Sequence, residues 1–145
     1  MLKNFLIISM ALTLFGCQSD TPIEYQNLKL FPQGTAFSGF SLSDHNNHKI
    51  NADSFKGQTS VVFFGFTNCP DICPTTLQEL KMTDKLLKEA GKPSPNFVFI
   101  SVDPDRDKPE NLKSYIEYFN PEFTAATGDK ANILSLASQL GVAYH

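Results

Sequence analysis

Cys69 and Cys73, separated by three residues, are the side chains whose type and spacing could do chemistry. Before them, residues 61–64 (Val-Val-Phe-Phe) form a short β-branched and aromatic run that favours a strand covered on both faces. Pro74 suits the first turn of a helix, where its missing N–H is not needed. We therefore expect Cys73 at the N-cap and Cys69 just before it in the loop. Backbone N–H groups and the helix dipole favour an anion there, and so lower the pKa of a thiol.

Three uses of this cysteine pair are open. Two soft thiolates with one more ligand suit Cu(I), whereas a structural zinc site needs four ligands and no second Cys pair or Cys/His pair is visible in the sequence. The same sulfurs could close an internal disulfide and act in thiol exchange. The plainest interpretation is a structural disulfide or two inert core residues. We favour a functional role for the two cysteines over a structural one, because a structural pair seldom needs a helix N-terminus.

Three segments of the chain resemble motifs of a known family. They are residues 64–77 (FGFTNCPDICPTTL), residues 99–107 (FISVDPDRD) followed by Pro109, and Thr127-Gly128 with the later Leu140-Gly141-Val142. In this order and at this spacing they resemble the Sco/SenC family, which are thioredoxin-like copper chaperones of cytochrome oxidase assembly. The resemblance runs from about Phe40 to the end of the sequence.

The resemblance implies that Cys69 and Cys73 bind copper and pass it by ligand exchange to the dinuclear copper site of cytochrome c oxidase. The partners would be the copper-bearing oxidase subunit, a copper donor and a thiol reductant, and no reaction would be catalysed. In the family a histidine from a later segment completes the copper site. His145 lies too early to match that ligand, so its role is not carried over.

An enzymatic use of the same cysteines is the alternative. The protein would be a membrane-anchored thiol–disulfide reductase or a thioredoxin-like peroxidase, in which one cysteine attacks and the other resolves. Three intervening residues place the sulfurs a helical turn apart, which a metal can bridge and a disulfide can still close. We favour copper, with thiol–disulfide exchange as a companion activity that copper binding does not exclude.

The remaining pattern predicts an α/β, thioredoxin-like fold. A hairpin with a polar turn is expected between Phe37 and Ile50, then a helix over residues 75–90, a strand over 97–102, and helices behind Pro109 and Asp129. Alternating strands and helices form a right-handed parallel unit with the thiols at the carboxyl end of its first strand. The closing strands and final helix of such a fold do not appear, so we expect the domain to be incomplete.

Polar residues outside the cysteine motif offer weaker candidates. Asp103 follows the second strand and is expected at the rim that holds the thiols, where it could orient a ligand, receive a partner or bias thiol protonation. The alternative is loop chemistry, with Asp103 in a turn and Asp107 capping the next helix. His45 and His48 have a spacing that could suit a metal, but an Asn- and Asp-rich turn is more often solvated.

The N-terminal region predicts export. Residues 1–16 contain Lys3, an apolar run too short to span a bilayer, and a cleavage-like stretch before Cys17, as in a lipoprotein signal peptide. Cys17 would be lipidated and hold the mature chain to a membrane; a secretory peptide cut elsewhere is the alternative. Residues 17–35 are interpreted as a tether and 36–145 as the copper-binding domain. We expect a bacterial lipoprotein on the periplasmic side of the cell membrane, and the net charge of −3 argues against a nucleic-acid partner.

Overall fold

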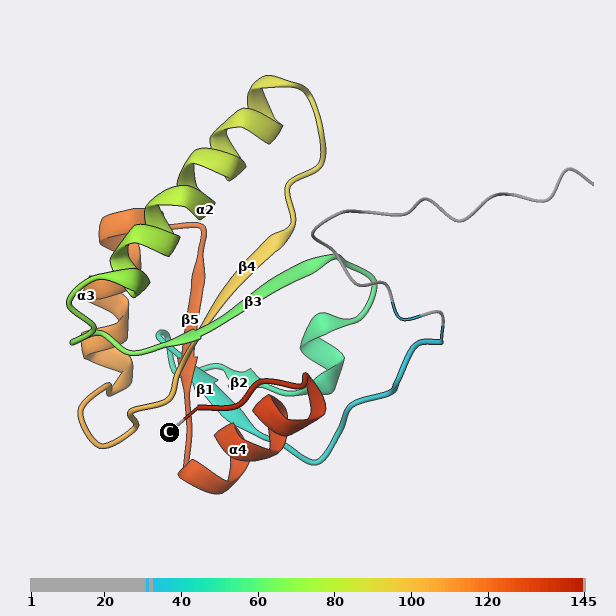
Figure 1. The fold of residues 1–145 in the computed structure, drawn as a ribbon, viewed down its shortest axis with the longest axis vertical. Coiled ribbons are helices and arrows are strands. Elements are labelled where there is room, and N and C mark those ends of the chain that lie inside the picture. The colour runs from blue at the N-terminus through green and yellow to red at the C-terminus, as the bar shows by residue number, and fades with distance from the viewer. Residues whose placement is uncertain (1–30, 32, 145) are drawn as a thin grey trace, which may run out of the picture. The chain divides into compact units, whose positions relative to one another are not determined.

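The computed structural model describes residue 31 and residues 33–144, and from Thr35 onward the described residues form one unit (Figure 1). The elements, in chain order, are β1 Leu42–Asp44, β2 Lys49–Ile50, the 3-10 helix η2 Ala52–Phe55, β3 Ser60–Gly65, α2 Ile72–Glu89, β4 Asn96–Ser101, α3 Pro109–Phe119, β5 Thr124–Thr127 and α4 Lys130–Gln139. The predicted α/β class is confirmed.

The strands form a single mixed sheet in the order β2-β1-β5-β4-β3. β3, β4 and β5 are parallel, and β1 runs antiparallel to both β5 and β2. The register places Gly65 beside Ser101, so the carboxyl ends of β3 and β4 lie at the same edge. The segments that follow these two strands carry the cysteine motif and the aspartate-rich motif, which the sheet thereby brings together.

Side chains of β4 alternate between two cores on opposite faces of the sheet. Phe97 and Phe99 pack with residues of α2 and α3, whereas Val98 and Ile100 pack with residues of α4 and the N-terminal hairpin. Figure 1 shows the ribbons of α2 and α3 on one side of the sheet and that of α4 on the other. β3, expected to be covered on both faces, contributes to both cores but stays half-buried, because β4 is its only neighbour in the described sheet. Helices packed on both faces of the sheet hold the ends of its strands in place.

The predicted hairpin is formed by β1 and β2, and its turn is held by Asp44. The Asp44 carboxylate accepts the backbone N–H groups of Asn46 and His48 at 2.8 and 2.7 Å, and Asn47 adopts a positive φ of 65°. His45 is buried rather than solvated, and its Nδ1 accepts the N–H of Ala125 at 3.1 Å. Both rings of the histidine pair therefore have structural contacts, since His48 Nδ1 lies 3.3 Å from Asp44.

Strand β5 was not predicted. Its sequence, Thr-Ala-Ala-Thr, lacks the large apolar residues that mark a buried strand, yet Ala125 and Ala126 are fully buried. Small side chains fit there because Phe97 and Phe123 pack beside the strand with ring centroids 4.7 Å apart. Tertiary packing, not propensity, makes this segment a strand.

The predicted signal peptide, Cys17 and the tether up to residue 30 lie outside the described residues. Among the residues that are described, no helix has the length and apolar character needed to cross a membrane. The division into signal, tether and domain stays a prediction.

Candidate functional site

Helix α2 begins earlier than predicted. Its N-cap is Asp71, and the N–H of Thr75 donates to the Asp71 carbonyl at 3.2 Å, so the first turn already contains Cys73. Cys73 is therefore the second residue of the helix rather than its N-cap. Pro74 still fits, because the first four N–H groups of a helix have no partner within it. The helix ends at Glu89, and Gly91, with φ of 63°, provides the predicted stop.

The two sulfurs are brought together at this helix start. Cys69 Sγ accepts the backbone N–H of Cys73 at 3.4 Å, and both cysteines are free thiols. Cys69 is partly exposed, whereas Cys73 is 4% exposed. One sulfur is thus accessible from solvent and the other lies in the interior next to it.

Gly65 makes room for the buried sulfur. A Cβ atom at this position would lie 2.9 Å from Cys73 Sγ and 2.8 Å from Phe99 Cε2, both closer than normal van der Waals contact. The backbone of β3 and the sulfur therefore approach each other at a distance that only glycine permits. The glycine of the motif fixes how deeply Cys73 is buried.

The thiol pKa values move in opposite directions. The pKa of Cys69 is lowered, first by its hydrogen bond with the Cys73 thiol and then by the N–H groups of Asp71, Cys73 and Ile72. Burial first, and then the hydrogen bond with Cys69, raises the pKa of Cys73 to about 11. The expected lowering is wrong for Cys73, because desolvation outweighs the helix N-terminus at a buried sulfur. Cys69 is the sulfur that ionises first.

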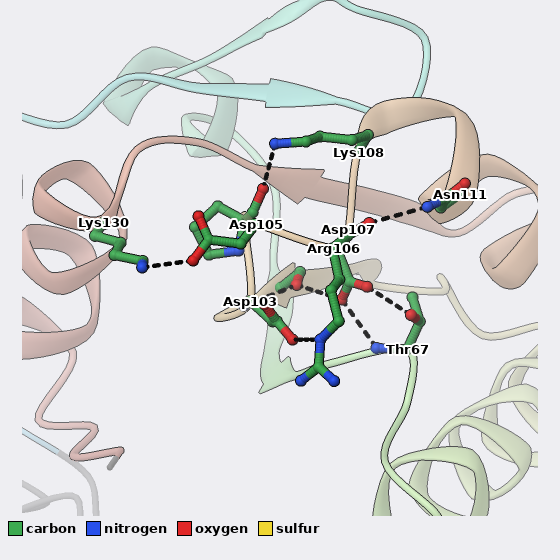
Figure 2. Close-up of polar contacts among 10 residues, drawn as sticks. Thr67, Asp103, Asp105, Arg106, Asp107, Lys108, Asn111 and Lys130 are labelled. Atoms are coloured by element: carbon green, nitrogen blue, oxygen red, sulfur yellow. Dashed lines mark hydrogen bonds and ion pairs between the residues drawn. The ribbon is translucent and has the colours of Figure 1, made fainter.

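Asp103 and Asp105 pair with cations. Asp103 Oδ2 lies 2.5 Å from Arg106 Nε, and Asp105 Oδ2 lies 2.6 Å from Lys130 Nζ (Figure 2). Lys108 Nζ donates to the carbonyl of Pro104 at 2.7 Å and closes the loop. These contacts give Asp103 the structural role in the loop that was its alternative interpretation. Its role at the rim that holds the thiols stays a prediction.

Asp107 is the carboxylate that reaches the cysteine loop, and sequence reasoning missed this. It is 1% exposed and accepts the N–H and hydroxyl of Thr67 at 2.9 and 2.5 Å and the hydroxyl of Ser101 at 2.6 Å (Figure 2). The alternative in which Asp107 caps α3 is wrong, since Lys108 is the N-cap. The carboxylate turns inward because buried donors surround it. A threonine two residues before Cys69 was the available signal.

The pair of thiols offers two candidate metal ligands. Within residues 33–144, no cluster of three or more His, Cys, Asp or Glu side chains is arranged to hold a metal ion. His45 and His48 belong to the hairpin turn, and His145 lies outside the described residues. The two sulfurs lie at one helix start, and the pKa of one of them, Cys69, is lowered. This arrangement fits a soft monovalent ion, which can be bound by two thiolate ligands.

Comparison with known proteins identifies the family. The sequence model of SCO1/SenC matches residues 32–145, which is most of the chain and includes the whole described domain. The chain belongs to the SCO1/SenC family. A protein of Stutzerimonas stutzeri named "Putative copper-binding protein" is 33% identical over 98% of this chain and 71% of its own length.

Solved structures of the family share this fold. Yeast Sco1 with copper bound has a TM-score of 0.71 at 31% identity, covering 76% of this chain and 61% of that chain. BsSco, described as a Sco-family cytochrome c oxidase assembly protein with a disulfide switch, has a TM-score of 0.60 at 25% identity, covering 72% and 63%. The fold is thus thioredoxin-like, as in these Sco structures. Several other curated relatives are matched over about half of their length, 51%.

Proposed function

We propose that this SCO1/SenC protein is a copper metallochaperone that binds one Cu(I) through Cys69 and Cys73. The observation that carries the proposal is the pair of adjoining free sulfurs at the start of α2. Copper-bound relatives and a relative named for copper binding support the choice of metal. Thiolate ligands favour Cu(I) over harder ions.

The two sulfurs would have different roles in the binding and release of copper. Cys69, partly exposed and with a lowered pKa, is the first ligand available to an incoming ion. Cys73, buried and protonated, releases its proton as the metal takes its place, so binding is coupled to proton release. The exposed sulfur is also the one an acceptor thiol can reach, which suits transfer by ligand exchange.

The acceptor we propose is the copper-bearing subunit of cytochrome c oxidase, at its dinuclear copper site. The description of BsSco as a member of the Sco family of oxidase assembly proteins supports it. A copper donor and a thiol reductant complete the set of partners. We also propose an exported protein held to the periplasmic side of the cell membrane by lipid on Cys17. Loss of the protein from the membrane fraction in Cys17→Ser cells would be the expected result.

Anaerobic titration of the reduced full chain with Cu(I), against a competing chelator, tests the metal assignment. A Cys17→Ser background leaves Cys69 and Cys73 as the only thiols, since the sequence has three cysteines. Tight one-to-one binding that disappears in the Cys69→Ser, Cys73→Ser variant is expected. His48→Ala is the matched control and should bind like the parent, because His48 serves the hairpin turn. Stoichiometric binding by the doubly substituted variant would refute the proposal.

Thiol–disulfide exchange is the second candidate, and the opposite pKa shifts of the two thiols favour it. A thiolate at Cys69 can attack a disulfide of an acceptor, and Cys73 beside it can resolve the mixed disulfide. The disulfide switch identified in BsSco also supports this use. A Cys73→Ser variant should then trap a mixed disulfide with a peptide that contains a disulfide, with Cys69 bonded to one peptide sulfur and the other peptide sulfur released as a thiol, whereas Cys69→Ser should not react. Equal trapping by both variants would contradict this order of attack.

A further inference from the structure

Tyr115 of α3 lies beside the cysteine site without belonging to either sequence motif. Its ring centroid is 5.7 Å from that of Phe99 and 5.2 Å from that of Phe119. The edge of the same Phe99 ring and the sulfur of Cys73 meet at Gly65, at 2.8 and 2.9 Å from the position its Cβ would take. Phe99 therefore has the buried sulfur at its edge and the tyrosine ring beside it.

The other side of Tyr115 borders the loop that leads to Cys69. Together with Thr67 and Asn68 it lines a cavity of about 590 Å³. Thr67 is the residue whose N–H and hydroxyl are held by the buried carboxylate of Asp107. The tyrosine and the cysteine loop thus border the same hollow, with the tyrosine on its α3 side.

The hydroxyl of Tyr115 is buried and has no hydrogen-bond partner among the described residues. A buried polar group without a partner costs stability, and buried tyrosine hydroxyls usually find one. Phenylalanine would fill the same space among Phe99 and Phe119 without this cost. The hydroxyl is therefore unfavourable in the free-thiol state that the structure describes.

The titratable groups that act on this hydroxyl are all acidic and carry negative charge only when they lose a proton. Burial raises the pKa of Tyr115 to about 12, with smaller contributions from Cys73, Cys69 and Asp107. The phenol therefore keeps its proton at neutral pH and can donate a hydrogen bond. Asp107 already accepts from Thr67 and Ser101, and Cys69 accepts from three backbone N–H groups, which leaves the sulfur of Cys73 as the acceptor with the fewest donors.

We infer that Tyr115 is a positioning residue whose hydroxyl donates a hydrogen bond to the sulfur of Cys73 when that sulfur is metal-bound and anionic. The inference rests on the proposed binding of Cu(I) by the cysteine pair. In the free-thiol state the Tyr115 hydroxyl has no hydrogen-bond partner among the described residues. In the copper-bound state it stabilises the negative charge on the Cys73 sulfur and fixes the orientation of that side chain. The hydroxyl thereby favours the loaded state over the free one.

Tyr115→Phe tests this, in the full chain with Cys17→Ser. Removing a hydrogen bond to a charged group should weaken Cu(I) affinity roughly ten- to a hundredfold in competition with a chelator. The unfolding midpoint of the metal-free variant should stay unchanged or rise, because only an unpartnered hydroxyl is removed. Tyr118→Phe is the matched control, since Tyr118 lies on the same helix with 75% of its surface exposed.

A spectroscopic readout separates this role from a packing role. Cu(I) loading of the parent should produce a tyrosine difference signal in the near-ultraviolet, retained in Tyr118→Phe and lost in Tyr115→Phe. Unchanged affinity and an unchanged difference signal in Tyr115→Phe would overturn the inference while leaving copper binding intact. Absence of Cu(I) binding by the parent would overturn the proposed function and this inference together.

Discussion

Adding a single carbon atom at Gly65 should destabilise the fold and displace the thiol pair together. In Gly65→Ala the new Cβ would lie 2.8 Å from Phe99 Cε2 and 2.9 Å from Cys73 Sγ. Neither neighbour can move freely, because Phe99 is 1% exposed and Cys73 is 4% exposed. Such overpacking costs about 1–3 kcal/mol, and the lower entropy of the unfolded alanine chain offsets about 0.4–1 kcal/mol of it.

With mid-range values of both effects, the expected net loss is about 1 kcal/mol in the free energy of unfolding. Urea unfolding of the metal-free, reduced protein measures it, with an expected fall in midpoint at constant slope. Gly34→Ala is the control, because a Cβ there meets nothing within 4 Å and its backbone has no positive φ. The Cu(I) affinity of Gly65→Ala should fall as well, since the sulfur of Cys73 is pushed from its place.

A double-mutant cycle makes this prediction refutable at the level of atoms. Removing the sulfur with Cys73→Ala eliminates one of the two close contacts, so Gly65→Ala should cost less in that background than in the parent. If the cost is the same in both backgrounds, the contact with the sulfur is not what Gly65 relieves. A Gly65→Ala protein as stable as the parent would refute the steric argument altogether.

Three further predictions concern charge and hydrogen bonding. Asp107→Asn should lower stability by about 1–3 kcal/mol in urea unfolding, because an amide cannot accept from all the donors of Thr67 and Ser101; an unchanged midpoint would contradict this. At pH 7, Cys69 should be alkylated long before Cys73, as peptide mapping would show, since the pKa of Cys69 is lowered and that of Cys73 is raised. The raised pKa of Cys73 means that the native state holds its proton longer than the unfolded chain, so stability present below pH 9.0 should decline as the pH rises towards about 11. Cys73→Ser should flatten that decline, and an equally steep decline in the variant would exclude Cys73 as its source.

The sequence was sufficient for the local features around the thiols. The β-branched and aromatic run before Cys69 predicted β3, Pro74 predicted the start of a helix nearby, and Gly91 predicted its end, all because these residues restrict the backbone by themselves. The apolar spacing behind Asp129 predicted α4, and Asp129 is its N-cap, accepting the N–H of Asn132. The spacing of the two cysteines predicted that they act in one site, and the family motifs added the expectation of copper.

Other features were decided by the tertiary structure. No local signal predicted β5, whose small residues become a strand only because two cores enclose them. Local patterns offered Asp107 as the cap of α3, which is wrong, and predicted a lowered pKa for Cys73, whose pKa is raised. Asp107 turns inward because β3 and β4 end side by side and present Thr67 and Ser101 to it. Cys73 keeps its proton because Gly65 and Phe99 enclose its sulfur. Spacing along the chain fixes which groups can meet, but burial, which depends on residues distant in sequence, sets the dielectric environment that decides their charge.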